Sequence, residues 1–111
     1  MMDRIAESDW KLLRQLHPLA LDRFCQQVLC EAGHLATDQE ASAHHRYLAL
    51  FDLIMRRNAE LAETFDDLRR SNAFLKLACI RAHELLTDDQ FSRFTLATRN
   101  VVNTLIAARS T

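Results

Sequence analysis

Hydrophobic residues recur at alternating intervals of four and three through the middle of the chain. With two asparagines in the same series, they form a continuous stripe of Tyr47, Phe51, Ile54, Asn58, Leu61, Phe65, Leu68, Asn72, Leu75, Cys79, Ala82 and Leu86. These intervals are those of heptad a and d positions, which share one face of an α-helix. Such a face has to be buried against other helices, from the same chain or from a second copy. The pattern therefore predicts a long central helix over residues 38–86, either straight or kinked.

A straight helix over this segment raises a problem of size. It would be about 73 Å long at ~1.5 Å per residue, whereas a compact domain of this length is roughly 35 Å across. Breaks at Arg57-Asn58 or Ser71-Asn72 are the alternative, because Asn and Ser are good helix caps. The stripe keeps its phase through both sites, and this favours a continuous helix.

The two asparagines occupy a positions two heptads apart, at Asn58 and Asn72. Buried polar residues at such positions can fix the register and the oligomeric state of an assembly. Alternatively, they mark helix ends or the rim of a bundle. The positions beside the stripe include the apolar residues Leu50 and Met55, so the apolar face is wide and suits a bundle of three or more helices. We expect a homodimer, with this interface: Tyr47, Phe51, Ile54, Asn58, Leu61, Phe65, Leu68, Asn72 and Leu75.

Cap and breaker residues predict shorter helices on both sides of the central one. In the N-terminal part, Ser8 is expected to cap a first helix, Pro18 to begin a second or to kink a single bent rod, and Gly33 to end it. Two capping boxes follow, Thr37 to Glu40 before the central helix and Thr87 to Gln90 after it. The second box begins a short helix with Phe91 and Phe94, and Thr95 is expected to cap a last helix bearing Val101, Val102, Leu105 and Ile106.

Composition supports an all-α fold. The 111 residues include a single glycine and a single proline, whereas sheet proteins need turn residues every few positions. Leu, Ala, Arg, Glu and Gln, which favour helices, are abundant. We predict one helical domain over residues 1–111, a length at which a core can form without disulfides or metals.

Charge and cysteine usage limit the classes of partner and compartment. The net charge of −1 gives no electrostatic reason to expect a nucleic-acid partner. The N-terminal residues contain no apolar signal region, and no apolar run is long enough to span a membrane. The three cysteines, Cys25, Cys30 and Cys79, form no CxxC pair, so we expect free thiols in a reducing cytoplasm.

The chain contains no recognisable catalytic arrangement. His34, His44 and His45 lie near acidic residues and form the best candidate for a metal site. However, His44 and His45 point about 100° apart on a helix, no HExxH motif is present, and no histidine lies four residues from either. A single glycine also excludes a Gly-rich phosphate loop. We therefore predict no catalytic residue, no cofactor and no bound metal.

The sequence as a whole favours a small self-associating module for protein interaction or regulation, without catalysis. The alternative is a monomeric helical adaptor that docks a protein partner in an apolar groove. A metal-dependent enzyme built on His34, His44 and His45 is a third, weaker hypothesis.

Overall fold

The computed structural model describes residues 4–109 and consists of helices and connecting segments, with no strand in that range. The all-α prediction is confirmed. The elements in chain order are α1 (Glu7–Ala36), α2 (Ala43–Phe65), the short 3-10 turn η1 (Arg70–Asn72), α3 (Ala73–Ala82), α4 (Asp88–Ser92) and α5 (Leu96–Arg109). Residues 1–3 and 110–111, at the two ends of the predicted domain, lie outside the described residues.

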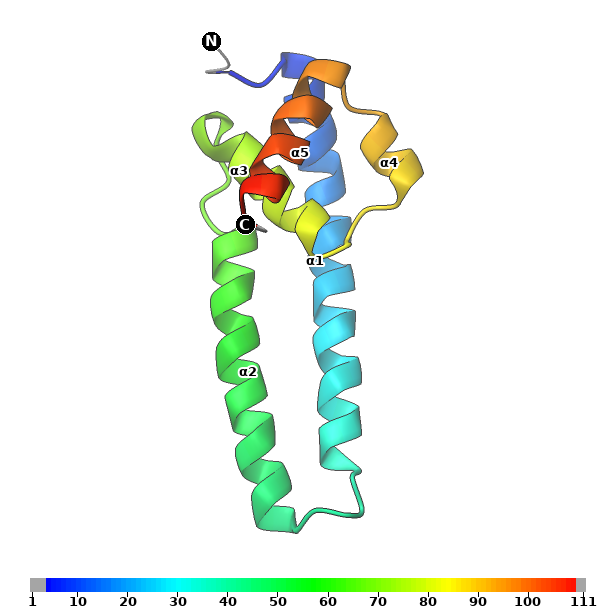
Figure 1. Ribbon diagram of the computed structural model, residues 1–111, viewed down its shortest axis with the longest axis vertical. Coiled ribbons are helices and arrows are strands. Elements are labelled where there is room, and N and C mark those ends of the chain that lie inside the picture. Colours follow the sequence, from blue (N-terminus) through cyan, green and yellow to red (C-terminus); the bar gives the residue numbers. More distant parts are fainter. Residues whose placement is uncertain (1–3, 110–111) are drawn as a thin grey trace.

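The molecule is divided into two regions, which we call the head and the arm (Figure 1). The head consists of the N-terminal half of α1 with α3, α4 and α5. The arm is an antiparallel hairpin made by the C-terminal half of α1 and by α2, joined at the tip by residues 37–42. The arm makes the molecule elongated, with extents of 54 × 26 × 23 Å and a radius of gyration of 16.6 Å. A compact chain of this length would have a radius of gyration of about 13 Å.

The hydrophobic core lies in the head. Every fourth or third residue along the first half of α1 is apolar and faces α3 and α5, and the two phenylalanines around α4 close the core from the side. The side chains with almost no exposed surface include Leu13, Ala20, Phe24, Ala73, Leu77, Ile80, Leu85, Phe94 and Val102. Burial of large apolar side chains contributes about 1.5–3 kcal/mol each to folding, so most of the stability of the chain arises here.

A buried carboxylate joins the two ends of the head. Asp9, in the first turn of α1, is 2% exposed. Its oxygens accept hydrogen bonds from the Thr95 amide at 3.0 Å, the Thr95 hydroxyl at 2.6 Å and the Thr98 hydroxyl at 2.6 Å. The negative charge therefore lies at the N-terminus of α5, where free amides and the helix dipole stabilise it. The predicted α5 is confirmed, and it begins directly after Thr95.

The prediction of one continuous helix over residues 38–86 is wrong. The helix ends at Phe65 and the chain reverses through Asp67, whose φ of 57° lies in the left-handed region that Asp tolerates better than most residues. Asn72 holds this turn, since its side chain accepts from the Arg69 amide at 2.9 Å and donates to the Asp67 carbonyl at 2.8 Å. The break therefore lies beside Ser71-Asn72, the second of the two predicted sites, while Arg57-Asn58 lies inside α2.

The N-terminal boundaries differ from those predicted. Ala6 rather than Ser8 is the N-cap of α1, because Asp9 already fixes this turn against α5. Pro18 lies inside α1, which continues through it as a single rod. Gly33 does not end α1, which runs on to Ala36 and is closed by Thr37, whose amide and hydroxyl both donate to the Gly33 carbonyl, at 3.1 and 2.8 Å.

One of the two predicted capping boxes exists. Before α2, Ser42 is the cap and accepts from the His45 amide at 3.1 Å, so the predicted box at Thr37 to Glu40 is wrong. Those residues form the tip of the arm instead. The box before α4 is confirmed, because Thr87 and Gln90 each accept the other's amide, at 3.1 and 3.0 Å.

Candidate interaction surface

The structure separates the predicted interface into two groups. Tyr47, Phe51, Ile54 and Asn58 lie together on the exposed side of α2, followed by the half-buried Leu61. Phe65 is buried where the arm meets the head, and its ring contacts those of His17 and Phe24. Beyond the break, Leu68 and Asn72 are half-buried in the turn, and Leu75 lies exposed on α3. The stripe is therefore one continuous surface only along α2.

One exposed side of α2 carries no charged residue. Between His44 and Ala62, nine positions lie within about 140° around the helix axis, at ~100° per residue. All nine are exposed, and none is Asp, Glu, Lys or Arg: His44, Tyr47, Leu48, Phe51, Ile54, Met55, Asn58, Ala59 and Ala62. A solvent-facing side of a helix normally carries the charges, and on α2 this side is the apolar one.

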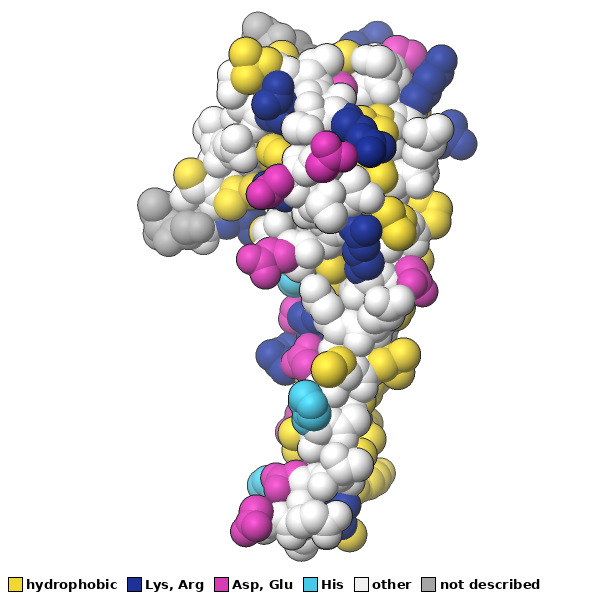
Figure 2. All heavy atoms as spheres, turned by 90° about the vertical axis from the view of Figure 1, so that its right-hand side faces the viewer, with side chains coloured by type: hydrophobic (Ala, Val, Ile, Leu, Met, Phe, Trp, Pro, Cys, Tyr) yellow, Lys and Arg dark blue, Asp and Glu magenta, His cyan; other side chains and the backbone are white. Residues whose placement is uncertain are grey.

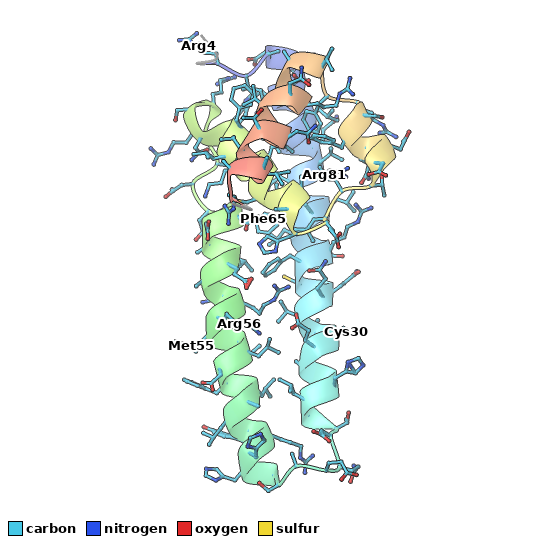
Figure 3. The ribbon with its side chains drawn as sticks, in the orientation of Figure 1. Arg4, Cys30, Met55, Arg56, Phe65 and Arg81 are labelled. Carbon is cyan, nitrogen blue, oxygen red and sulfur yellow. The ribbon has the colours of Figure 1, made fainter. Side chains whose placement is uncertain are left out.

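Six large side chains make up what we call the apolar face. Their exposed fractions are 70% for Leu29 of α1 and, along α2, 62% for Tyr47, 47% for Leu48, 56% for Phe51, 45% for Ile54 and 59% for Met55. Figure 3 shows Met55 on the outer side of α2, turned away from α1. In Figure 2 the hydrophobic side chains gather mainly along one edge of the arm, and charged and histidine side chains along the other.

The other edge of the arm is polar, as is usual for a protein surface in contact with water. It presents a shallow surface groove lined in part by Glu31 and His34 of α1 and by Asp52 and Arg56 of α2. The hairpin is therefore amphipathic as a unit, with one side suited to water and one that is not.

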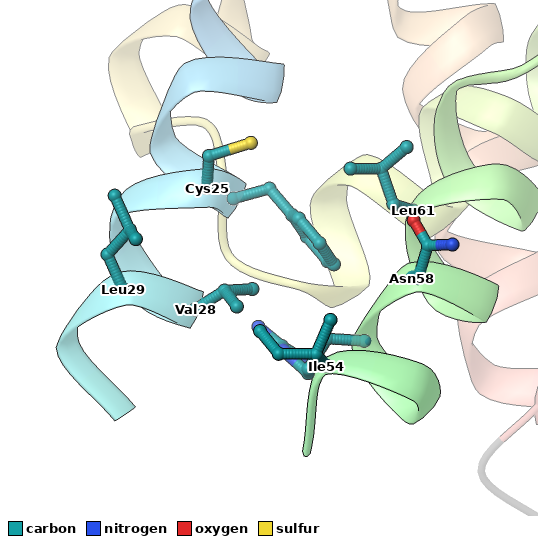
Figure 4. Close-up of a pocket in the computed structure, with 8 residues that line it drawn as sticks. Cys25, Val28, Leu29, Ile54, Asn58 and Leu61 are labelled. Carbon is teal, nitrogen blue, oxygen red and sulfur yellow. The ribbon is translucent and has the colours of Figure 1, made fainter. Parts of the chain in front are cut away.

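A groove of about 220 Å³ lies between the two helices of the arm and opens beside the apolar face (Figure 4). We call it the socket. Most of its lining is apolar, and it is made by Phe24, Cys25, Val28 and Leu29 of α1 and by Ile54, Arg57, Asn58 and Leu61 of α2. An engineered apolar cavity of about 150 Å³ is enough to hold benzene, so the socket has room for an aromatic ring.

Arg57 forms the floor of the socket and ties the two helices together. Only 11% of its side chain is exposed. Its guanidinium lies 4.5 Å from the centre of the Phe24 ring, donates to Glu60 at 3.0 Å and to Gln27 at 3.2 Å, and lies 3.3 Å from a Glu31 oxygen. Its charge is thus compensated within the arm, and the walls above it are left apolar.

The tip of the arm is closed by a second arginine. Arg46 donates to the Ala36 carbonyl at 2.6 Å and so caps the end of α1 from the start of α2. With Ser42 capping α2, both helix ends at the tip are satisfied by side chains. The hairpin is thereby fixed at its tip as well as at the head.

The three histidines weighed as a candidate metal site, His34, His44 and His45, lie near the tip. His34 is in the last turn of α1, His44 and His45 begin α2, and all three are exposed. Within residues 4–109, no group of three or more His, Cys, Asp or Glu side chains is placed so that it could hold a metal ion. In the same range, no helix is both long enough and apolar enough to cross a membrane.

Leu29, Leu48 and Met55 belong to the apolar face but were absent from the predicted interface. Leu48 and Met55 are seven residues apart and lie beside the stripe, so a wider helical projection of the sequence would have included them. Leu29 lies about 140° around α1 from Phe24, at ~100° per residue, so it falls outside the row of α1 residues that pack in the core.

No family model matches the chain, and no curated protein or solved structure is significantly similar to it. The function proposed below therefore depends on the geometry of this chain alone.

Proposed function

We propose that this protein is a self-associating interaction module and that two copies pair through the apolar faces of their arms. The observation that carries the proposal is the charge-free, exposed side of α2, which includes Tyr47, Phe51 and Met55. Its role in this proposal is binding, without catalysis and without a cofactor.

The size of the apolar face supports this function. Aromatic side chains present about 150–250 Å² each and large aliphatic ones somewhat less, so six that are roughly half exposed leave on the order of 500 Å² of apolar surface. The largest apolar patch on a typical monomer is about 300–600 Å² and is often functional. Two such faces in contact would bury roughly 1,000 Å², which is the area at which specific interfaces begin.

The absence of charge supports pairing between identical surfaces. A two-fold interface brings each patch against itself, so a charged residue near its centre would meet a like charge. The nine positions on this side of α2 contain no such residue. Two paired hairpins would form a four-helix bundle, an arrangement in which each helix buries a wide apolar side.

Light scattering coupled to size exclusion, over a series of micromolar dilutions, tests the proposal. We expect a mass near twice 12.8 kDa for the native chain. Phe51→Asp places a charge at the centre of the apolar face and should give a monomer that keeps its helical circular dichroism. Leu96→Asp is the matched control, because Leu96 is 62% exposed but lies on α5 in the head, and this variant should remain a dimer.

A native chain that is monomeric at every concentration would overturn self-association. In that case the apolar face would belong to the alternative function, an adaptor that binds a helix of another protein in the socket. A dimer that survives Phe51→Asp but not Leu96→Asp would place the interface on the head and would equally contradict the proposal.

A further inference from the structure

We infer that the socket of one copy receives Phe51 of a second copy, in an antiparallel pairing of arms about a two-fold axis that passes near Ile54. This inference rests on the proposed function and specifies the arrangement of the pair. It is argued from the positions of the socket, of the apolar face and of the ends of α2.

Along α2, the socket extends from residue 54 toward the head, and three of the large exposed side chains lie on the tip side of that residue. The socket is lined by α2 residues 54, 57, 58 and 61, whereas the exposed residues toward the tip are Tyr47, Leu48 and Phe51. In an antiparallel pair with its axis at residue 54, position 51 of one copy faces position 57 of the other. Each copy would then supply one ring and one socket.

The direction of the side chain agrees with this arrangement. A helical side chain leans toward the N-terminus of its helix, so Phe51 leans toward the tip of its own arm. In an antiparallel partner, that direction leads toward positions 58 to 61, which are deeper in the socket. In a parallel pair, Phe51 would instead meet the partner's Phe51, and both sockets would stay empty.

The lengths of the two arms fit the same axis. α2 extends from Ala43 to Phe65, so its midpoint is Ile54. Its charge-free exposed run extends from His44 to Ala62, with its midpoint at residue 53, about 1.5 Å away along the helix. In an antiparallel pair centred here, the two α2 helices lie side by side over their whole length. Their contact ends where the tip of each arm reaches the partner's head. The two heads would lie at opposite ends of the bundle.

Cys25 lines the socket and provides a native reporter of what enters it. Phe51→Cys, made in a chain that also carries Cys30→Ser to remove the exposed thiol, should form a disulfide between copies under mild oxidation. Disulfides need Cα atoms within about 7 Å, so efficient linkage reports contact between position 51 and the socket. Within one chain, position 51 lies about seven residues, or roughly 10 Å, nearer the tip than the residues opposite Cys25, so an internal disulfide is excluded.

The expected result is a reducible covalent dimer whose linked peptides join Cys25 of one copy to position 51 of the other. Leu75→Cys in the same background is the control, because Leu75 is equally exposed but lies on the head, and it should stay monomeric on a denaturing gel. Adding Cys25→Ser to Phe51→Cys should abolish the linkage.

Three outcomes would overturn the inference, and they differ in what they mean for the proposed function. Linkage that persists without Cys25 would show that the two positions 51 contact each other, either in parallel arms or about an axis near residue 51. Self-association through the arms would then stand. A dimer by light scattering that gives no covalent product would show that the interface lies elsewhere. A monomer in solution would overturn both the inference and the proposed function.

Discussion

The head and the arm contain similar proportions of apolar residues, but the head buries most of its large ones and the arm leaves most of its large ones exposed or half-buried. In the head, residues from α1, α3, α4 and α5 enclose side chains such as Leu13, Leu77 and Phe94, which have almost no exposed surface. In the arm, Leu53 is the only buried residue between positions 25 and 63. Two helices alone have too little surface to enclose the wide apolar side that α2 carries.

This difference separates stability from the proposed binding. The apolar residues of the head find their partners within the chain, and they account for why it folds. Those of the apolar face contribute little to the isolated fold, because they face water in it. A change in the head should therefore unfold the protein, whereas a change on the apolar face should alter its association and leave the folded monomer intact.

Phe65→Ala should have the largest effect on folding. The side chain is 5% exposed and contacts the rings of His17 and Phe24 where arm and head meet. Removing a buried phenylalanine costs about 3–5 kcal/mol, a large share of a typical total of about 5–15 kcal/mol. Urea denaturation followed by circular dichroism measures the loss in the free energy of unfolding.

The matched variant for Phe65→Ala is Phe51→Ala, the same substitution on the apolar face. Surface changes are usually within about 0.5 kcal/mol, so the monomer should unfold at almost the same urea concentration as the native monomer. Equal losses in the two variants would show that the distinction between head and arm is wrong.

Asp9→Ala should have the next largest effect, a loss of about 2–3 kcal/mol in the free energy of unfolding. The substitution leaves the exposed Thr95 hydroxyl and the buried Thr98 hydroxyl without their acceptor, and hydrogen bonds to a charged group are each worth about 1.5–3 kcal/mol. Hydrogen exchange should show the loss of protection in the first turns of α5, with the arm unchanged. Thr104→Ala is a suitable control, since that hydroxyl only donates to the Asn100 carbonyl within α5. Protection lost first in the arm would contradict this assignment.

Arg57→Met should have an intermediate effect confined to the arm. It keeps most of the apolar stem but removes the bonds to Glu60 and Gln27 and the stacking on Phe24. The side chains of Glu31 and Glu60 are 46% and 27% exposed, so water partly solvates their carboxylates once the arginine is gone. We therefore expect a loss of about 1–2 kcal/mol in the free energy of unfolding. Amide exchange should accelerate in residues 25–63 more than in α3, and uniform acceleration throughout the chain would contradict this role.

The smallest effect concerns pH. The hydrogen bond from Arg70 lowers the pKa of Glu7 below its usual range, with further help from the charges of Arg70 and Lys11. The stabilisation is therefore complete at neutral pH and is lost as the pH falls through the folded pKa. Glu7→Gln should lower the melting temperature slightly at pH 7 and not at all at pH 2. Both groups are exposed, so 1 M salt should remove the difference, and a difference that grew in acid would contradict the sign.

The sequence predicted the parts of this fold that depend on neighbouring residues. The Thr87 box, α4 and α5 follow from local caps and periodicity, and they are confirmed. The break after Phe65 was hidden because the interval 66–72 contains seven residues, one full heptad, so α3 resumes in phase with α2. A periodic pattern cannot distinguish a seven-residue turn from two turns of helix.

The candidate surface was only partly accessible to sequence reasoning. The stripe identified Tyr47, Phe51 and Ile54, but it also included Phe65, which the head buries. Which residues of an apolar stripe stay exposed depends on where the neighbouring helices end. The socket depends in addition on the register between α1 and α2, which the Arg46 cap and Arg57 fix through contacts far apart in sequence.

The sharing of α1 between head and arm has a consequence for the order in which the nascent chain acquires its contacts. The hairpin closes through only six loop residues, 37–42, and can form while synthesis continues at about 5–20 residues per second. Asp9, by contrast, waits for partners 86 and 89 positions later. Until those residues leave the ribosome, Trp10 and Leu13 have no core to enter, so the first turns of α1 are where a chaperone would find the growing chain unprotected.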